Sequence, residues 1–110
     1  MLKITVQEET DTVILKVEGR IAGPGSAELH RAWRSLTPAL NSKKLVVDLR
    51  GVSSIDRDGE LLMGELYAKT GAEFQTSSVF IEFLIHKAIE NHEKNGKEHE
   101  YERSLRSAHQ

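Results

Sequence analysis

The segment at residues 44–59 limits the possible folds more than any other part of the chain. Residues 45–49 read Leu-Val-Val-Asp-Leu, a nearly continuous apolar run typical of a central strand that is covered on both faces. A polar stretch follows at residues 50–58, and apolar residues then recur at helical spacing from Leu62 onward. We therefore expect a strand, a loop and the start of a helix. Such a corner presents free backbone N–H groups to anions, yet here it already carries two carboxylates, Asp56 and Asp58.

Two strands are predicted before this segment. Apolar and polar residues alternate at positions 2–6 and again at positions 13–21, which is the period of a half-buried strand. The polar turn at residues 8–12 separates the two runs, so the pattern predicts an antiparallel hairpin. Gly19 interrupts the second run and indicates a bulge or bend there.

Three helices are predicted around the strands. Ser26 is the expected N-cap of the first helix, and Pro38 limits how far that helix continues regularly. Gly71 is the expected stop of the second helix, and a third helix at about 79–92 follows a short strand at 72–76. The apolar stripes of the first two helices consist of Leu29, Ala32, Trp33, Leu36 and Leu40, and of Leu62, Met63, Leu66 and Tyr67. This order predicts an α/β domain with a mixed sheet of four to five strands and helices packed mainly on one face.

The third predicted helix is unusually apolar. Phe80 and Phe83 widen its apolar stripe beyond what one buried face needs. The helix is either well buried, or its phenylalanine edge forms a homodimer contact. The composition turns polar after this helix. We therefore expect a single domain over residues 1–92 and a polar extension or tail over residues 93–110.

Composition excludes several classes of function. The chain has 110 residues, enough for one domain, and its net charge of −2 provides no basic field for nucleic acid. It has no cysteine, so neither disulfides nor thiolate zinc sites can form. No apolar run is long enough for membrane insertion, and no signal peptide is visible, so we expect a cytoplasmic location.

The segment at residues 44–59, preceded by the hairpin and first helix, resembles the STAS domain, a family that includes bacterial anti-sigma-factor antagonists. The resemblance covers roughly residues 2–90. Its most specific part is the apolar strand ending in Asp-Leu, the Gly-Val turn, and Ile-Asp-x-x-Gly opening a helix. The family's Asp-Ser-Ser-Gly motif corresponds to Asp56, Arg57, Asp58 and Gly59. Asp58 therefore stands where the family has its phosphoacceptor serine, and Glu60 also departs from the family pattern.

The resemblance implies a non-catalytic protein–protein interaction module. Its implied partner is an anti-sigma factor that is also a GHKL-type serine-kinase-like ATPase. The expected contact surface comprises the loop after the third strand and the exposed face of the second helix, with Ser53, Ser54, Asp56, Arg57, Asp58, Gly59, Glu60 and Gly64 as the candidate partner-binding residues. Gly64 would let a partner approach closely, although close helix packing inside the domain explains a glycine there better.

Three interpretations of Asp58 are open from the sequence. Its charge of about −1 could mimic the phosphorylated state, in which phosphoserine carries about −1.5 to −2. It could instead pair with a basic group on a partner that needs no switch. It could also be no more than the N-cap of the second helix, since aspartate is favoured there. Asp56 is expected to be structural, with its side chain binding N–H groups of the loop. Ser53 or Ser54 could accept phosphate in its place, although loop serines commonly support turns.

Two other functions are weighed against this one. Some stand-alone STAS proteins are accessory subunits of lipid-transport ABC complexes, and others sense nucleotides; a fixed anion at position 58 disfavours phosphate there. The sequence contains no catalytic triad and no P-loop. Its five histidines lack metal-site spacing. We expect no enzyme activity, no metal and no cofactor.

Overall fold

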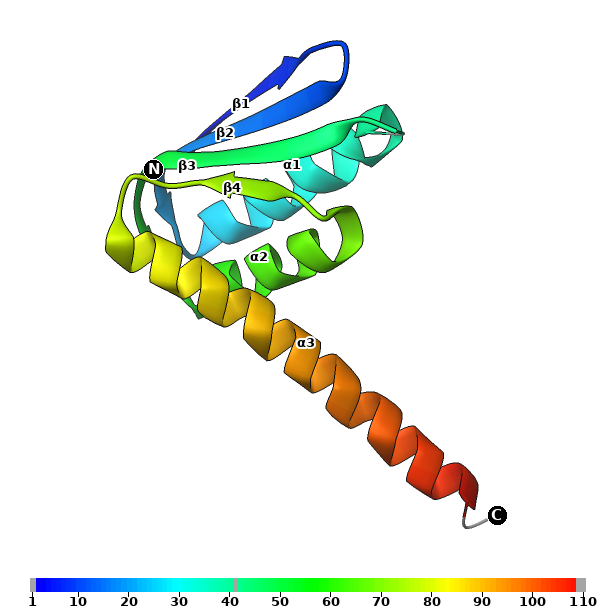
Figure 1. Cartoon of the computed structure of the whole chain (residues 1–110). Helices are drawn as coiled ribbons and strands as arrows, with labels where there is room; N and C mark the ends of the chain where they lie inside the picture. The colour runs from blue at the N-terminus through cyan, green and yellow to red at the C-terminus, as the bar shows by residue number, and fades with distance from the viewer. Residues whose placement is uncertain (1, 41, 109–110) are drawn as a thin grey trace.

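The computed structural model describes residues 2–40 and 42–108, with the side chains of residues 39 and 95–108 outside that description. Four strands and three helices follow one another along the chain (Figure 1). Their bounds are β1 Leu2–Glu8, β2 Thr12–Ile21, α1 Pro24–Leu40, β3 Lys44–Ile55, α2 Arg57–Thr70, β4 Glu73–Gln75 and α3 Val79–Ala108.

The strands form one mixed sheet in the order β1-β2-β3-β4. β1 and β2 pair antiparallel, with Leu2 opposite Gly19 and Glu8 opposite Val13, so the predicted hairpin is confirmed. β2 and β3 run parallel, as do β3 and β4. The parallel neighbours require crossover connections, and α1 and α2 provide them.

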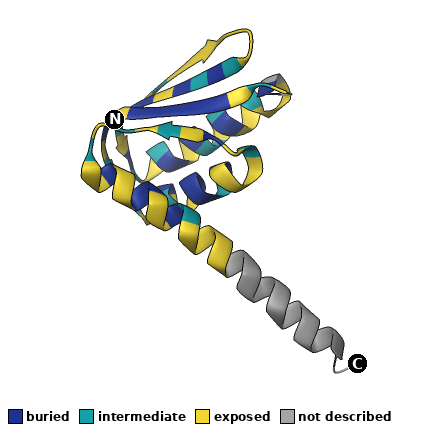
Figure 2. Ribbon diagram, in the orientation of Figure 1, coloured by how far each residue is buried: buried dark blue, intermediate teal, exposed yellow. Residues whose placement is uncertain are grey.

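The core lies between one face of the sheet and the helices. Alternate residues of the two central strands point to that face and are buried, namely Val13, Leu15, Val17, Leu45, Val47 and Leu49. Figure 1 shows α1 and α2 below the sheet with α3 lying across α2, and Figure 2 shows the buried residues concentrated where these layers meet. The predicted α/β class, four-stranded mixed sheet and helices on one face are therefore confirmed.

The predicted loop at residues 50–58 is wrong in its extent. β3 continues through Ile55, so Ser53 and Ser54 belong to a strand. The polar end of β3 pairs with the end of β2, where register shifts follow Lys16 and Gly19. Gly19 has φ 104°, a conformation that favours glycine, and it provides the expected bulge. The polar residues at the end of β3 resemble a loop in the sequence, because the strand with which they form hydrogen bonds, β2, lies far earlier in the chain.

The predicted end of the third helix at about residue 92 is also wrong. α3 continues to Ala108 and extends beyond the rest of the domain (Figure 1). The side chain of Ser78 accepts from the N–H of Ile81 at 3.3 Å and so caps the start of α3. The helical form of residues 93–108 agrees with a polar helical extension. The domain boundary at residue 92 stays a prediction.

Candidate functional site

Asp56 occupies the junction between β3 and α2. Its backbone is extended, with φ −86° and ψ −178°, and its carboxylate accepts from the N–H of Gly59 at 2.8 Å. The N–H of Glu60 donates to the Asp56 carbonyl at 2.9 Å, which is the first hydrogen bond of the helix. Asp56 is therefore the N-cap of α2, and the prediction that Asp58 could be that cap is wrong.

The same carboxylate also holds the start of α1. Its Oδ2 accepts from the N–H of Gly23 at 3.0 Å, and its Oδ1 accepts from the hydroxyl of Ser26 at 3.3 Å. The N–H of Asp56 donates to the carbonyl of Ile21 at 2.9 Å. Because α1 begins at Pro24, Ser26 lies inside the helix and is not its N-cap as predicted. One side chain thus joins the β2–α1 connection to the start of α2.

These hydrogen bonds stabilise the ionised form of Asp56. The N–H of Gly23 lowers the pKa of the Asp56 carboxyl most, followed by the N–H of Gly59, and the hydroxyl of Ser26 acts in the same direction. The anion is bound within the domain by its own backbone. Asp56 is therefore a structural group that fixes the geometry of the corner.

Asp58 has a different environment. It lies in the first turn of α2 and is exposed. No hydrogen bond or ion pair engages its carboxylate among the side chains that the structure describes. The helix dipole favours a negative charge at this position, but nothing within the described domain binds the carboxylate. Asp58 is free to contact another molecule.

The remaining predicted residues divide into exposed and buried groups. Arg57 is exposed and Glu60 partly so, both at the start of α2. Ser53 is exposed on β3 and donates to the carbonyl of Gly19 at 3.3 Å, while Ser54 is half-buried.

Gly59 and Gly64 are buried. A Cβ on Gly59 would lie 2.8 Å from Ile21 Cγ2, and one on Gly64 would lie 2.7 Å from the carbonyl oxygen of Ala88 in α3. Gly64 is therefore not part of an exposed face, and it permits the close helix packing inside the domain that the sequence favoured, because α3 packs directly on it.

Leu61 is a surface residue that the sequence analysis missed. Its relative exposure is 53%, high for a leucine in a helix that packs on two neighbours. The sequence does indicate an exposed apolar residue here, because positions 61–63 are three consecutive apolar residues. Three consecutive helical residues span about 200°, more than one buried stripe can accept. Since Leu62 and Met63 are buried, Leu61 points outward.

Leu61 lines two shallow hollows. The hollow toward α1 measures about 350 Å³ and includes Asp58 and Glu65 in its lining. The hollow toward α3 measures about 330 Å³ and includes Arg57 and Lys94 together with Glu60. We define the α2 docking surface as Arg57, Asp58, Glu60 and Leu61. It presents an apolar side chain among charged groups of both signs, and such charges help to orient a partner.

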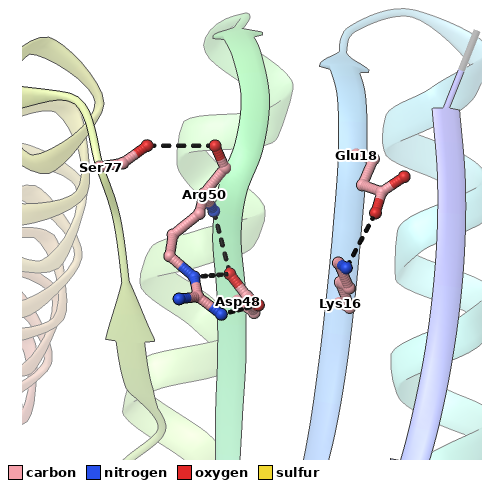
Figure 3. Close-up of polar contacts among 5 residues, drawn as sticks. All are labelled: Lys16, Glu18, Asp48, Arg50 and Ser77. Atoms are coloured by element: carbon pink, nitrogen blue, oxygen red, sulfur yellow. Dashed lines mark hydrogen bonds and ion pairs between the residues drawn. The ribbon is translucent and has the colours of Figure 1, made fainter.

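A buried carboxylate, Asp48, lies on the sheet face that the helices leave uncovered (Figure 3). It accepts from Arg50 through Nε at 3.0 Å and through the terminal nitrogen at 2.9 Å. These hydrogen bonds lower the pKa of Asp48 against the opposing effect of its burial. Ser77 donates to the Arg50 carbonyl at 3.1 Å, which fastens the chain after β4 to β3. The Asp48 carboxylate thus has its hydrogen-bond partners within the domain, and it lies apart from the α2 docking surface.

The described side chains provide no cluster of three ligand-type residues for a metal ion. None of the helices, over the residues described, combines the length and apolarity needed to cross a bilayer.

Comparison with known proteins gives similarities in fold. No family model matches the chain. A crystal structure of Mglu matches at 25% identity with a TM-score of 0.55, and Mglu in its native form matches at 21% with a TM-score of 0.54. Both matches cover 67% of this chain but only 19% and 22% of Mglu, so the chain spans about a fifth of that protein's length.

An antisigma-factor antagonist STAS domain from Rhodobacter sphaeroides is also matched. The identity is 16% and the TM-score 0.48, over 68% of this chain and 84% of that domain. The order of strands and helices is the one expected from the sequence, and the chain is an α/β domain with a four-stranded mixed sheet.

Proposed function

We propose that this chain is a non-catalytic protein–protein interaction module that binds its partner through the α2 docking surface. The proposal rests on the different environments of two aspartates that lie two positions apart, Asp56 and Asp58. Asp56 forms the intramolecular hydrogen bonds of the corner, whereas Asp58 is exposed without a partner among the described side chains. A carboxylate that stabilises no other described element is available for recognition, and Leu61 beside it provides apolar contact area.

The proposed partner is an anti-sigma factor of the serine-kinase-like ATPase class, acting in the cytoplasm. Asp58 occupies the position that corresponds to the phosphoacceptor serine in the resembling family. It carries about −1 permanently, where phosphoserine would carry about −1.5 to −2. The protein would therefore present one fixed state to such a partner. Either it mimics the phosphorylated form, or its carboxylate pairs with a basic group of the partner.

Affinity capture from the native cell tests this proposal. Wild type, Asp58→Ser and Asp58→Asn serve as baits, with Ser53→Ala as a control that keeps the aspartate. We expect wild type and the control to recover the same proteins, and Asp58→Asn to change the amount of one ATPase-type protein. If Asp58 mimics phosphoserine, Asp58→Ser becomes phosphorylated at position 58 by that partner with ATP. Identical recovery by all four baits would contradict a docking role for Asp58. Recovery of an ABC-transporter ATPase that depends on Asp58 would instead favour the accessory-subunit function.

We also propose that the first turns of α3 form a homodimer contact. Val79, Phe80 and Phe83 are 85%, 62% and 59% exposed, and their spacing places them on one side of the helix. Aromatic side chains are enriched at protein interfaces. A twofold contact would double this small patch, since each copy presents the same residues.

A further inference from the structure

A larger hollow lies between α1 and α2, toward the C-terminal ends of both helices. It measures about 530 Å³, within the range of small-molecule sites. Figure 1 shows the two helices side by side below the sheet, and α2 packs far more extensively on α3 than on α1. We call this hollow the α1–α2 groove. Its lining includes Trp33, Arg34, Thr37, Lys43, Glu65 and Lys69.

The chemistry of the groove differs from that of an ordinary helix–helix seam. Helices normally meet through apolar residues, but this seam holds three long cationic side chains around a single tryptophan. The indole Nε1 of Trp33 is buried and has no hydrogen-bond acceptor among the described residues. Buried donors are nearly always satisfied. The contact between α1 and α2 at this groove therefore does not have the composition of a closely packed helix pair.

The charges in the groove leave one cation uncompensated. Lys69 pairs with Glu65 at 3.0 Å and lies 5.5 Å from the centroid of the Trp33 ring. Lys43 pairs with Glu8 at 2.8 Å. Arg34 is exposed and makes no ion pair with any side chain in the described part of the chain. The groove is therefore positive in a chain whose net charge is −2, and a local positive field concentrates anions.

We propose that the α1–α2 groove binds a small organic anion, with its acid group at Arg34 and its apolar body on the floor of the groove, where Trp33 and Leu40 are 4% and 8% exposed. The planar guanidinium of arginine suits a carboxylate or a phosphate ester equally, because both offer two oxygens to its paired donors. This site is separate from the α2 docking surface and does not depend on the proposed docking function.

Fluorescence titration tests the proposal directly, because Trp33 is the only tryptophan in the chain. The probes are benzoate, phenyl phosphate and inorganic phosphate, with benzyl alcohol as the neutral control. We expect a saturable change with at least one of the two organic anions, at a dissociation constant of about 1 mM or lower. The anion that binds more tightly identifies carboxylates or phosphate esters as the natural class. Inorganic phosphate should bind more weakly than phenyl phosphate, because it has no apolar body.

Two variants locate the site. Arg34→Gln should weaken the preferred anion about tenfold, since it removes a charge-assisted hydrogen bond. Arg31→Gln is the matched control, because Arg31 is exposed on the same helix but is absent from the lining of the groove; its affinity should equal that of wild type. The proposal is overturned if no organic anion saturates the signal, if benzyl alcohol binds equally well, or if a folded Arg34→Gln variant binds as tightly as wild type.

Discussion

Replacing Asp56 by alanine should destabilise the domain far more than the same replacement two residues later. The Asp56 carboxylate accepts hydrogen bonds from Gly59 at 2.8 Å, from Gly23 at 3.0 Å and from Ser26 at 3.3 Å. Alanine removes both carboxylate oxygens and with them all three hydrogen bonds, and it leaves the N–H groups of Gly59 and Gly23 without these partners. Asp58→Ala removes no hydrogen bond of the described residues.

The expected magnitudes follow from these contacts. Losing an aspartate N-cap costs about 1 kcal/mol, and losing the charge-assisted acceptor for Gly23 adds about 1–2 kcal/mol at a half-exposed site. We therefore expect Asp56→Ala to lower the free energy of unfolding by about 2–3 kcal/mol. Asp58→Ala should lower it by less than about 1 kcal/mol, because only the interaction of the charge with the helix dipole is lost.

Denaturant unfolding followed by circular dichroism measures both variants. The midpoint should fall strongly for Asp56→Ala and little for Asp58→Ala, with the slope of the transition unchanged in each. Asp56→Asn should lower the midpoint by an intermediate amount, since asparagine also caps helices but has no charge. Equal losses at positions 56 and 58, or a larger loss at 58, would refute the assignment of the cap and with it the argument that Asp58 is free for recognition.

Three further predictions concern pH, packing and assembly. The pKa values of Asp48 and Asp56 are lowered in the folded protein. The stability that these ionised carboxylates contribute is therefore complete above the unfolded pKa of about 3.9 and is lost as the pH falls through the folded pKa values. The free energy of unfolding should fall less steeply with decreasing pH for Asp56→Asn than for wild type, and an equally steep fall would contradict the lowered pKa of Asp56. Gly64→Ala should cost about 1–3 kcal/mol because its Cβ would meet the Ala88 carbonyl at 2.7 Å, whereas Gly51→Ala should cost less because it meets only the movable side chain of Glu18; equal thermal stabilities would contradict this. Phe83→Ser should reduce dimerisation measured by light scattering without lowering stability, and a wild-type protein that is monomeric at high concentration would rule out the dimer.

Much of the fold could be predicted because local patterns and tertiary structure agree. The alternation at residues 2–6 and 13–21 specifies the hairpin, and the buried run at 45–49 specifies the central strand. Gly71 ends α2 in the left-handed conformation expected of a C-cap, with φ 65°. In each case the residues themselves carry the structural signal.

The errors arise where distant residues determine the structure. Ser53 and Ser54 look like loop residues, but pairing with β2 extends the strand through them. From the sequence, Asp56 is expected to bind loop N–H groups, and Asp58 is a possible cap of the helix. The hydrogen bonds from Gly59, Gly23 and Ser26 assign the cap and the structural role to Asp56, and two of these donors come from a distant part of the chain. Likewise, the packing of Ala88 against Gly64 is invisible before the position of α3 is known.

The most direct test of the proposed function is the affinity of the purified ATPase-type partner for wild type and for Asp58→Asn, measured by calorimetry. Asparagine keeps the shape of the side chain and removes only its charge. We predict that Asp58→Asn changes the dissociation constant by at least about tenfold, equivalent to about 1.4 kcal/mol, while the free energy of unfolding stays within about 1 kcal/mol of wild type. Unchanged affinity in a stably folded Asp58→Asn protein would contradict the proposal that this carboxylate is a recognition group.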